Sequence, residues 1–216
     1  MVKKRDSKKA AVSVDKKTSD VVVPDVTDIK FYRASEKPYG AFSNLFRREI
    51  VFENRTFKTS EHAYQAGKPV DSKVTEWILN APTPGLLAMA AHGLYTWDIR
   101  PDWSKIKYDR MRAVLRAKFT QHDDLRDLLL STGDSRLVEA GTTDNLVNRT
   151  WGEVNGKGKN LLGVMLMELR TELRKEGRKA SKPKPAPSSA STKSKSVTNA
   201  GSQAVNKEKS KRKKPE

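Results

Sequence analysis

The sequence predicts an α+β fold: a single, predominantly helical domain with a small, mostly antiparallel sheet, flanked by disordered basic tails. Strand and turn patterns occupy the start of the domain, and segments with apolar residues at helical spacing follow them. Residues 1–28 are rich in Lys, Ser, Asp and Val without a sustained period, and apolar residues nearly vanish after residue 175. We therefore expect tails at 1–28 and 176–216 and one folded domain at 29–175.

Most of the positive charge lies in the tails. The chain has 216 residues and a formal net charge of +17, and residues 175–216 hold thirteen Lys or Arg against three Glu. The basic run at 209–214 can serve as a nuclear signal, a nucleic-acid contact or a solubilising extension, and the sequence leaves these alternatives open.

The composition also excludes several kinds of site. Without cysteine there is no disulfide, no thiolate zinc site and no Cys nucleophile, and the three histidines are not at metal-ligand spacing. We expect no metal and no cofactor. Since no apolar run is long enough for a membrane span and no signal peptide is evident, we expect no membrane association and a cytoplasmic protein, or a nuclear one if the host is eukaryotic.

The first segments of the domain predict the sheet. Residues 29–32 (Ile-Lys-Phe-Tyr) favour a short strand, and residues 36–40 form a cluster of turn residues. Residues 49–52 and the segment around Phe57 flank residues 53–56 (Glu-Asn-Arg-Thr), a pattern typical of a hairpin.

A short helix is predicted within residues 57–68. Thr59 offers a capping oxygen, and Glu61 lies in the first turn, where the helix dipole favours an anion. Glu61 and Lys68 are seven positions apart, which on a helix places them within about 20° of each other and about 10 Å apart along the axis. A carboxylate and an amine on one face suit a small polar ligand; the alternative is a capped surface helix with a loose ion pair.

The rest of the domain is mainly helical in pattern. A strand is expected at 136–140, and further helices are expected at 72–80, 86–92, 108–122, 123–130 and 161–173. Thr83-Pro84 provides a cap and a first-turn proline for the second of these helices.

Two candidate positions precede or follow the central helix. Ser43 and Asn44 are small polar residues on an early loop, with Arg33 upstream, and they can bind a ligand or serve only as turn residues. Trp103 lies near the start of a helix, where an aromatic residue is either part of the core or a platform on which a base stacks.

The last candidate cluster spans residues 148–160. Gly158 permits close backbone approach, Lys157 supplies charge, and Asn160 is expected to cap the final helix, whose free amides can hold a phosphate. The cluster lacks the Lys-Ser/Thr ending and the spacing of a nucleotide P-loop, so we do not expect an NTPase. It indicates a phosphate or diphosphate pocket.

A series of short motifs runs through the whole predicted domain in one order. They are Phe31-Tyr32, Tyr39-Gly40, Phe42-Ser43-Asn44, Thr59-Ser60-Glu61-His62, Gln65-Ala66 with Lys68, Trp103, Met111, Ala117-Lys118-Phe119, Leu137-Val138-Glu139, Trp151-Gly152, Gly156-Lys157-Gly158, Asn160, Leu162-Gly163 and Met167-Glu168-Leu169-Arg170. In these motifs, residues 29–174 resemble the NADAR family, also called YbiA-like.

The resemblance implies an α+β fold and metal-independent hydrolysis of N-glycosides. Two substrate groups are associated with the family: phosphoribosylated aminopyrimidines, which are early riboflavin intermediates, and ADP-ribose attached to guanine. The resemblance also implies that Glu61 is the catalytic carboxylate and that Lys68, Trp103, Glu139 and Trp151 belong to the pocket.

One position departs from the family pattern. Three residues before the Trp151-Gly152 pair the family commonly has Asp, and this chain has Asn148, which can hydrogen-bond a ribose hydroxyl but cannot act as a base. We count Asn148 and Gly152 among the substrate-binding residues. Asp144 can supply the missing carboxylate if the loop is rearranged.

We therefore predict a hydrolase that cleaves the ribose–base bond of a phosphoribosylated aminopyrimidine or of ADP-ribosylated guanine, alone or in nucleic acid. Glu61 would stabilise the positive charge that develops on the ribose. Lys68 would either contact a phosphate or attack the opened sugar as a Schiff-base nucleophile. The alternatives are a non-catalytic module that binds ADP-ribose or a nucleotide, and a protein that associates with nucleic acid through its basic tail.

Overall fold

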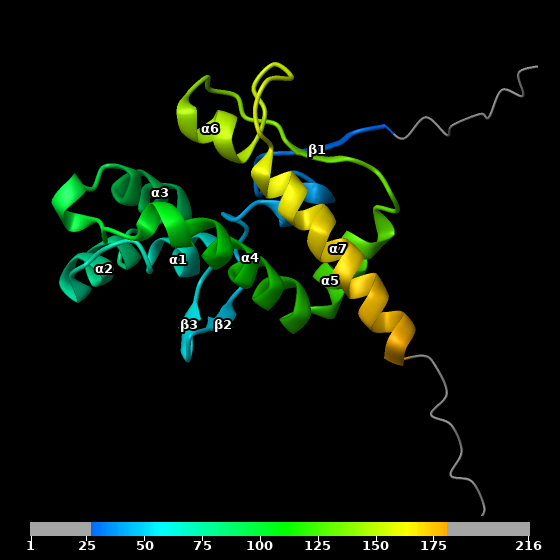
Figure 1. Ribbon diagram of the computed structural model, residues 1–216, viewed down its shortest axis with the longest axis horizontal. Helices are drawn as coiled ribbons and strands as arrows, with labels where there is room; N and C mark the ends of the chain where they lie inside the picture. Colours follow the sequence, from blue (N-terminus) through cyan, green and yellow to red (C-terminus); the bar gives the residue numbers. More distant parts are fainter. Residues whose placement is uncertain (1–26, 181–216) are drawn as a thin grey trace, which may run out of the picture. The chain divides into compact units, whose positions relative to one another are not determined.

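The computed structural model describes residues 27–180 (Figure 1), and the predictions for the tails before residue 27 and after residue 180 lie outside the described residues. The elements follow in the order β1 (Ile29–Phe31), the 3-10 helix η1 (Tyr39–Phe42), β2 (Ile50–Phe52), β3 (Arg55–Phe57), α1 (Ser60–Gln65), α2 (Ser72–Leu79), α3 (Pro84–His92), the 3-10 helix η2 (Thr96–Asp98), α4 (Trp103–Gln121), α5 (Asp123–Ser131), β4 (Leu137–Glu139), α6 (Leu146–Trp151) and α7 (Leu161–Ala180). None of the helices in this part of the chain is both long and apolar enough to cross a membrane.

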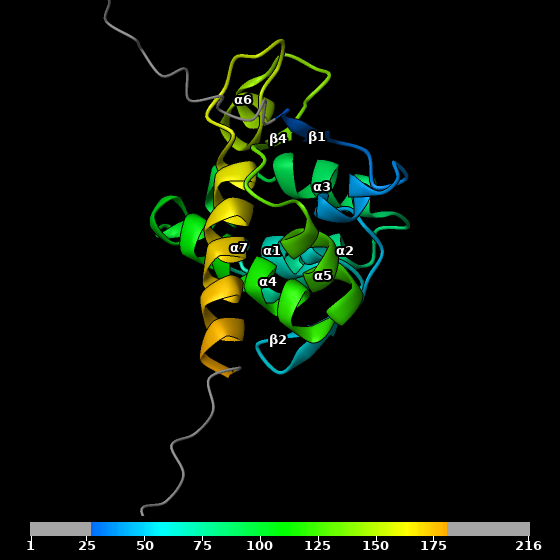
Figure 2. The same cartoon turned by 90° about the vertical axis from the view of Figure 1, so that its right-hand side faces the viewer.

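The strands form two separate pairs. The predicted hairpin is present as β2 and β3, joined by Glu53 and Asn54, whose positive φ values of 50° and 60° are those of a two-residue type I′ turn. Strand β1 lies beside β4 (Figure 2) and pairs with it in parallel, with Ile29 opposite Leu137 in the register. The α+β class is confirmed, but the described strands form one antiparallel and one parallel pair instead of a mostly antiparallel sheet.

Helix α4 lies between two hydrophobic clusters, with α1 on one side and α5 and α7 on the other (Figure 1). The larger cluster joins α4, α5 and α7 to β1, β4 and η1 through buried residues that include Phe42, Leu115 and Leu166. The smaller cluster joins α4 to the hairpin, α2 and α3 through residues that include Ile50 and Val114. Helix α1 contributes to both clusters, so it is held firmly at their junction.

Side-chain caps explain where two of the helices begin. Thr59 accepts a hydrogen bond from the His62 amide at the start of α1, and Thr83 accepts one from the Leu86 amide at the start of α3, both as predicted. Helix α4 begins at Trp103, five residues before the predicted start, and the short helix α6 was not predicted.

Helix α7 also extends beyond its predicted end at residue 173 and continues to Ala180. Leu173 is the last buried residue of α7 up to Gly177, where the description of its side chains ends. Beyond it, Arg116 of α4 binds Glu172 and Glu176, with N–O distances of 3.1 and 2.5 Å. These interhelical ion pairs and the helix-favouring residues Lys, Arg, Glu and Ala explain why the helix does not end with its apolar stripe.

Lys118 of α4 is a buried cation within the larger cluster. Its side chain is 1% exposed, and its ammonium donates hydrogen bonds to the carbonyl oxygens of Ala41 and Ser43 at 2.5 and 3.0 Å. Burial lowers the pKa of Lys118 to about 7, and the positive charge of Arg48 adds to this shift. Lys118 therefore fastens the loop that carries Ser43 and Asn44 to α4.

Replacing Lys118 with Met should destabilise the protein by about 1–3 kcal/mol, because the buried Ala41 carbonyl would lose the Lys118 donor and the Ser43 carbonyl would keep only its bond from the Phe46 amide. Denaturant unfolding, monitored by circular dichroism, measures this change. Lys175→Met is a suitable control, since Lys175 is exposed on α7. Equal stability of the Lys118 variant and the wild type would contradict the anchoring role.

Candidate active site

A cavity of about 410 Å³ lies where α1, α3, α4 and α6 meet the loops after β1 and η1. Most of the site residues predicted from the sequence line it. These are Arg33, Ser43, Asn44, Glu61, Lys68, Trp103, Glu139, Asn148 and Trp151. The structure therefore brings together residues that are as far as 118 positions apart in the sequence.

Glu61 lies in the first turn of α1 and is 8% exposed. The Gln65 side chain donates a hydrogen bond to Glu61 Oε1 at 2.7 Å. Burial raises the pKa of Glu61, while this hydrogen bond and the positive charge of Lys68 oppose the rise. A desolvated carboxylate that is held in one rotamer is well suited to face a developing positive charge.

Lys68 reaches the cavity from the turn after α1. The helix ends at Gln65, so Lys68 does not lie on a helical face with Glu61 as we predicted; its amide donates to the Gln65 carbonyl at 3.0 Å. The Lys68 ammonium donates to the carbonyl of Ala91 near the end of α3. Burial lowers the pKa of Lys68, Glu61 opposes this effect, and the nearby Lys107 adds to it.

Glu139 is the second carboxyl group of the cavity and stands at the end of β4. Burial and the negative charge of Glu61 raise its pKa to about 7. The charge of Glu61 thus shifts the pKa values of both Glu139 and Lys68 within the same cavity. Such coupled, shifted groups in a cleft are typical of catalytic sites.

Aromatic side chains form one wall. The Tyr64 ring lies 5.1 Å from the Trp103 ring and 5.6 Å from the Trp151 ring, measured between centroids. Tyr108 extends the group beyond Trp151, at 5.8 Å. Trp103 and Trp151 are only partly buried and both line the cavity, so the wall offers a surface on which a base can stack.

The loop after η1 supplies polar groups to the cavity. Ser43 and Asn44 are buried, and the Asn44 amide nitrogen lies 3.3 Å from Met111 Sδ, which is a weak acceptor. Asn44 Oδ1 and Gln65 Oε1 have no hydrogen-bond partner among the described residues. Unsatisfied buried acceptors are uncommon in folded proteins and often occur at functional sites.

Asn148 lines the cavity from α6, where Asn145 caps the helix by accepting from the Asn148 amide. The Asn148 side chain donates to the Thr143 carbonyl at 2.7 Å. Asp144 instead binds the exposed Arg149 through both carboxylate oxygens, at 2.5 and 2.6 Å. Asp144 does not line the cavity in this structure, so the observed loop does not place its carboxylate where the family's Asp would lie.

Four predicted site residues do not line the cavity: Gly152, Lys157, Gly158 and Asn160. Gly158 has a φ of 156°, and a Cβ there would clash with the Gly152 carbonyl, so the glycine serves the packing of the loop on itself. Lys157 is exposed. Asn160 does not cap α7 with its side chain. Its side-chain amide nitrogen donates to the Leu137 carbonyl at 2.8 Å, and its side-chain oxygen accepts from the Glu139 amide at 3.1 Å.

Sequence reasoning missed other lining residues, which are Tyr32, Leu45, Ala88, His92, Lys107, Met111, Val147 and Leu162. Lys107 was missed because the predicted helix began at residue 108, whereas α4 begins at Trp103 and places Lys107 one turn after it. No local sequence pattern marks His92 as a residue that lines the cavity. Its pKa is lowered by burial and by Lys68, so it faces the cavity as a neutral side chain near neutral pH.

Comparisons with known proteins show the family to which the chain belongs. The NADAR domain model matches residues 30–174. The N-glycosidase YbiA of Shigella flexneri serotype 5b is 43% identical over 148 residues, covering 68% of this chain and 89% of that protein. A riboflavin biosynthesis protein of Vibrio vulnificus is 34% identical over 146 residues, covering 67% of this chain and 38% of that protein.

A solved structure shows the same fold. The NMR structure of the Escherichia coli protein YbiA matches with a TM-score of 0.63 and 40% sequence identity, and the match covers 75% of this chain and 92% of that one. The family model spans nearly the whole described domain, including the segments that line the cavity. The chain belongs to the NADAR family.

Proposed function

We propose that the protein hydrolyses the N-glycosidic bond between a phosphorylated ribosyl group and a base. The single observation that carries the proposal is the meeting of Glu61, Lys68 and Glu139 in one cavity beside an aromatic wall. Relatives named N-glycosidase at 40–43% identity support an enzyme class among hydrolases acting on N-glycosyl bonds.

The chemistry of this bond explains the need for Glu61. Cleavage builds positive charge on the ribose carbon and the ring oxygen. A fixed carboxylate next to that centre stabilises the charge and can accept a proton from the attacking water. Glu61 is buried, which raises its pKa, and the hydrogen bond from Gln65 and the positive charge of Lys68 both favour its ionised form against this effect.

The remaining groups suit the leaving base and the sugar. Trp103 and Trp151 offer faces for stacking with the base. In its protonated form, Glu139 can act as a general acid and donate a proton to the nitrogen of the leaving base, so that the base leaves as a neutral molecule. Lys68 can contact a phosphate or act as a nucleophile toward the opened sugar.

Two substrates fit the proposal. The Vibrio relative is named a riboflavin biosynthesis protein, which supports a substrate from that pathway, and we propose a phosphoribosylated aminopyrimidine. The second candidate is ADP-ribosylated guanine, free or in nucleic acid, for which the basic residues at 209–214 would provide a tether.

Mass spectrometry of the products identifies the substrate. The full chain is incubated separately with a phosphoribosylaminopyrimidine and with DNA that carries ADP-ribosylated guanine. Release of ribose 5-phosphate supports the first substrate, and release of ADP-ribose supports the second. No product from either substrate on prolonged incubation would contradict the proposed activity.

The Glu139 pKa predicts the pH dependence of the rate. Because its pKa is raised to about 7, Glu139 is mostly protonated below pH 7 and loses its proton as the pH rises through 7. If the protonated form donates to the leaving base, kcat/KM, which reports ionisations of the free enzyme, should fall on the alkaline side of a titration near pH 7. In Glu139→Gln this titration should disappear from the pH–rate profile. Its persistence in the variant would assign it to another group.

A binding module is the second candidate function, and Asn148 favours it because the family commonly has a carboxylate there. In that case calorimetry would detect ADP-ribose binding while no product formed. Asn148→Asp would then be the first variant to test for a gain of turnover.

A further inference from the structure

Helix α1 carries Glu61 near its start and is followed by Lys68, so its two ends determine where these two groups stand in the cavity. The helix has only six residues, and an isolated helix of that length is not stable in water. Contacts with the rest of the fold must therefore fix both ends. Thr59 caps the start, and a different contact holds the end.

The chain leaves the helical pattern directly after α1. The Gly67 amide would bond the Ala63 carbonyl if the helix continued, but it donates to the Tyr64 carbonyl at 3.3 Å. The Lys68 amide likewise donates to the Gln65 carbonyl, three residues back, at 3.0 Å. The Ala63 carbonyl therefore needs a donor from another part of the chain, because an unpaired backbone group in the interior is costly.

Arg110 of α4 provides that donor. Its Nε donates to the Ala63 and Tyr64 carbonyls at 3.2 and 3.1 Å, and its Nη2 donates to the Ala63 carbonyl at 2.7 Å. Its Nη1 donates to both carboxylate oxygens of Glu53, in the turn of the hairpin, at 2.8 and 2.9 Å. The guanidinium also lies over the Phe52 ring, 5.0 Å from its centroid, and the side chain is only 10% exposed. Since all three guanidinium nitrogens are bonded, the side chain is held in one position, and its charge suits the end of a helix.

Gly67 makes this contact possible. A Cβ at position 67 would lie 2.3 Å from Arg110 Nε and 2.5 Å from Arg110 Cζ, so a side chain there would displace the guanidinium from its partners. Gly67 directly precedes Lys68 in the chain. Gly67 and Arg110 thus belong to one contact, which joins the turn that carries Lys68 to α4.

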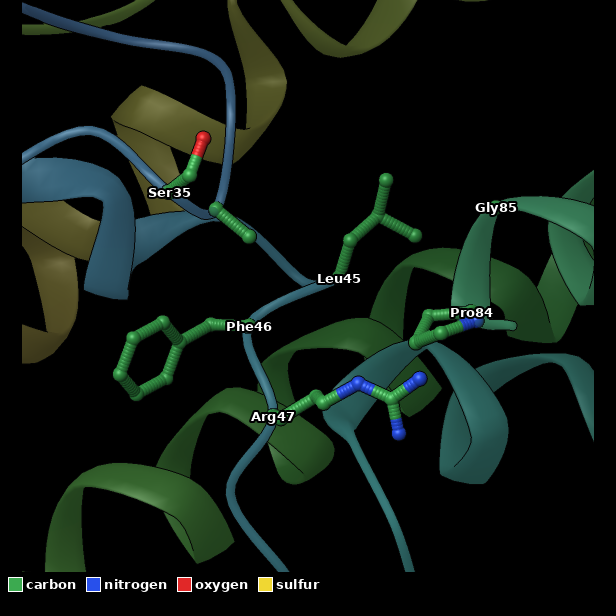
Figure 3. A pocket seen from close by; sticks show the side chains of 7 residues that line it. Ser35, Leu45, Phe46, Arg47, Pro84 and Gly85 are labelled. Atoms are coloured by element: carbon green, nitrogen blue, oxygen red, sulfur yellow. The ribbon is translucent and has the colours of Figure 1, made fainter. Parts of the chain in front are cut away.

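A second arginine near α1 does not have this role. Burial and the positive charges of Lys58 and Arg47 lower the pKa of His62 to about 4, so Arg47 lies close enough to α1 for its charge to act there. Figure 3 shows, however, that the Arg47 side chain extends from its loop toward Pro84 at the start of α3. Among the residues that the structure describes, only Arg110 donates a guanidinium hydrogen bond to the backbone of α1.

We propose that Arg110 is a positioning residue for the reaction: by holding the end of α1, it fixes where Lys68 stands relative to Glu61. Arg110 does not line the active-site cavity, so it acts through α1 and not on the substrate. The far side of the turn is tied as well, because the Lys68 carbonyl accepts from the Arg100 amide at 3.0 Å. This inference rests on the proposed function, in which Glu61 and Lys68 both serve the chemical step.

Steady-state kinetics on the full chain tests the role of Arg110. Arg110→Ala should lower kcat by about one to two orders of magnitude and change KM by less than about threefold, because a displaced catalytic group slows the chemical step more than it weakens binding. Arg112→Ala is the matched control. Arg112 also lies on α4 and forms ion pairs, with Asp109 and Glu168, but it does not contact α1, so kcat should stay within about twofold of the wild type.

Gly67→Ala tests the same contact from its other side. The new methyl group would displace the guanidinium, so this variant should reproduce the loss of kcat. In the Arg110→Ala background the space of the guanidinium is free, and adding Gly67→Ala should lower kcat by less than about a further twofold. Losses that multiply in the double variant would show that the two residues act independently, and they would overturn the proposal.

Amide hydrogen exchange, followed by NMR, provides a second readout that does not need turnover. In Arg110→Ala the Gly67 and Lys68 amides should exchange at least about tenfold faster than in the wild type, while the Leu166 amide in the buried part of α7 should keep its rate. Equal acceleration at all three amides would indicate a general loss of stability and would overturn the proposal, as would an unchanged kcat. A wild type that releases no base would contradict the proposed function, and the exchange rates would still decide whether Arg110 holds the turn.

Discussion

Replacing Glu61 with Gln is expected to lower kcat by about three orders of magnitude while the fold remains intact. The amide keeps the shape of the side chain and can still accept the hydrogen bond from Gln65. It cannot carry the negative charge that faces the ribose. Steady-state kinetics with the better of the two substrates measure the loss.

The stability of the same variant provides an internal control. Burial raises the pKa of Glu61 in the folded state, so the ionised carboxylate opposes folding at neutral pH, above its ordinary titration range. The neutral amide of the Glu61→Gln variant carries no such cost. We therefore expect a Tm equal to or higher than that of the wild type, and a variant with normal turnover would show that Glu61 has no catalytic role.

Replacing Lys68 with Met should lower kcat by about two to three orders of magnitude, with a smaller change in KM. Lys68 is 8% exposed, donates to the Ala91 carbonyl and is electrostatically coupled to Glu61. This position next to the reacting carboxylate indicates a role in the chemical step. A contact that only binds phosphate would instead raise KM and leave kcat unchanged.

Borohydride reduction distinguishes two ways in which Lys68 can act. If its amine forms an imine with carbon 1 of the opened sugar, reduction during turnover should add the mass of the ribosyl group to the wild type and not to Lys68→Met. Without this adduct, a loss of kcat in the variant assigns Lys68 to electrostatic support of Glu61. Lys107→Met is the matched control, since Lys107 also lines the cavity but is less buried.

The parts of the fold that depend on local chemistry could be predicted from the sequence. The Thr59 and Thr83 caps, the proline at the start of α3 and the hairpin turn all act within a few residues. Long-range pairing could not be predicted in this way. Strand β1 pairs with β4 more than one hundred residues later, and no spacing rule specifies such a partner or its direction.

The site was predictable where a motif marks the residue itself. Glu61, Trp103 and Trp151 were named from the sequence, and all three line the cavity. Glycine and lysine residues near 157–158 suggested a phosphate loop, but the close approach that the glycine permits is to the chain's own backbone. Glycine residues in a loop permit the close approach either of a ligand or of another part of the backbone. The sequence does not distinguish these two cases, and the folded structure does.

Helix α6 was also not predictable from the local sequence. It has only six residues, too few for an apolar period to be recognised, and it begins at a cap formed by Asn145. Its short length hid the helical turn between Asn148 and Trp151, although both residues were predicted to belong to the pocket that they line.

The measurement that tests the account most directly is a crystal structure of Glu61→Gln with an intact substrate. We expect carbon 1 of the ribose to lie in the active-site cavity, about 3.5 Å from the side chain at position 61, with the base against Trp103 or Trp151. A substrate bound with its glycosidic bond outside this cavity, or turned away from position 61, would contradict the central claim that Glu61 faces the bond that is cleaved.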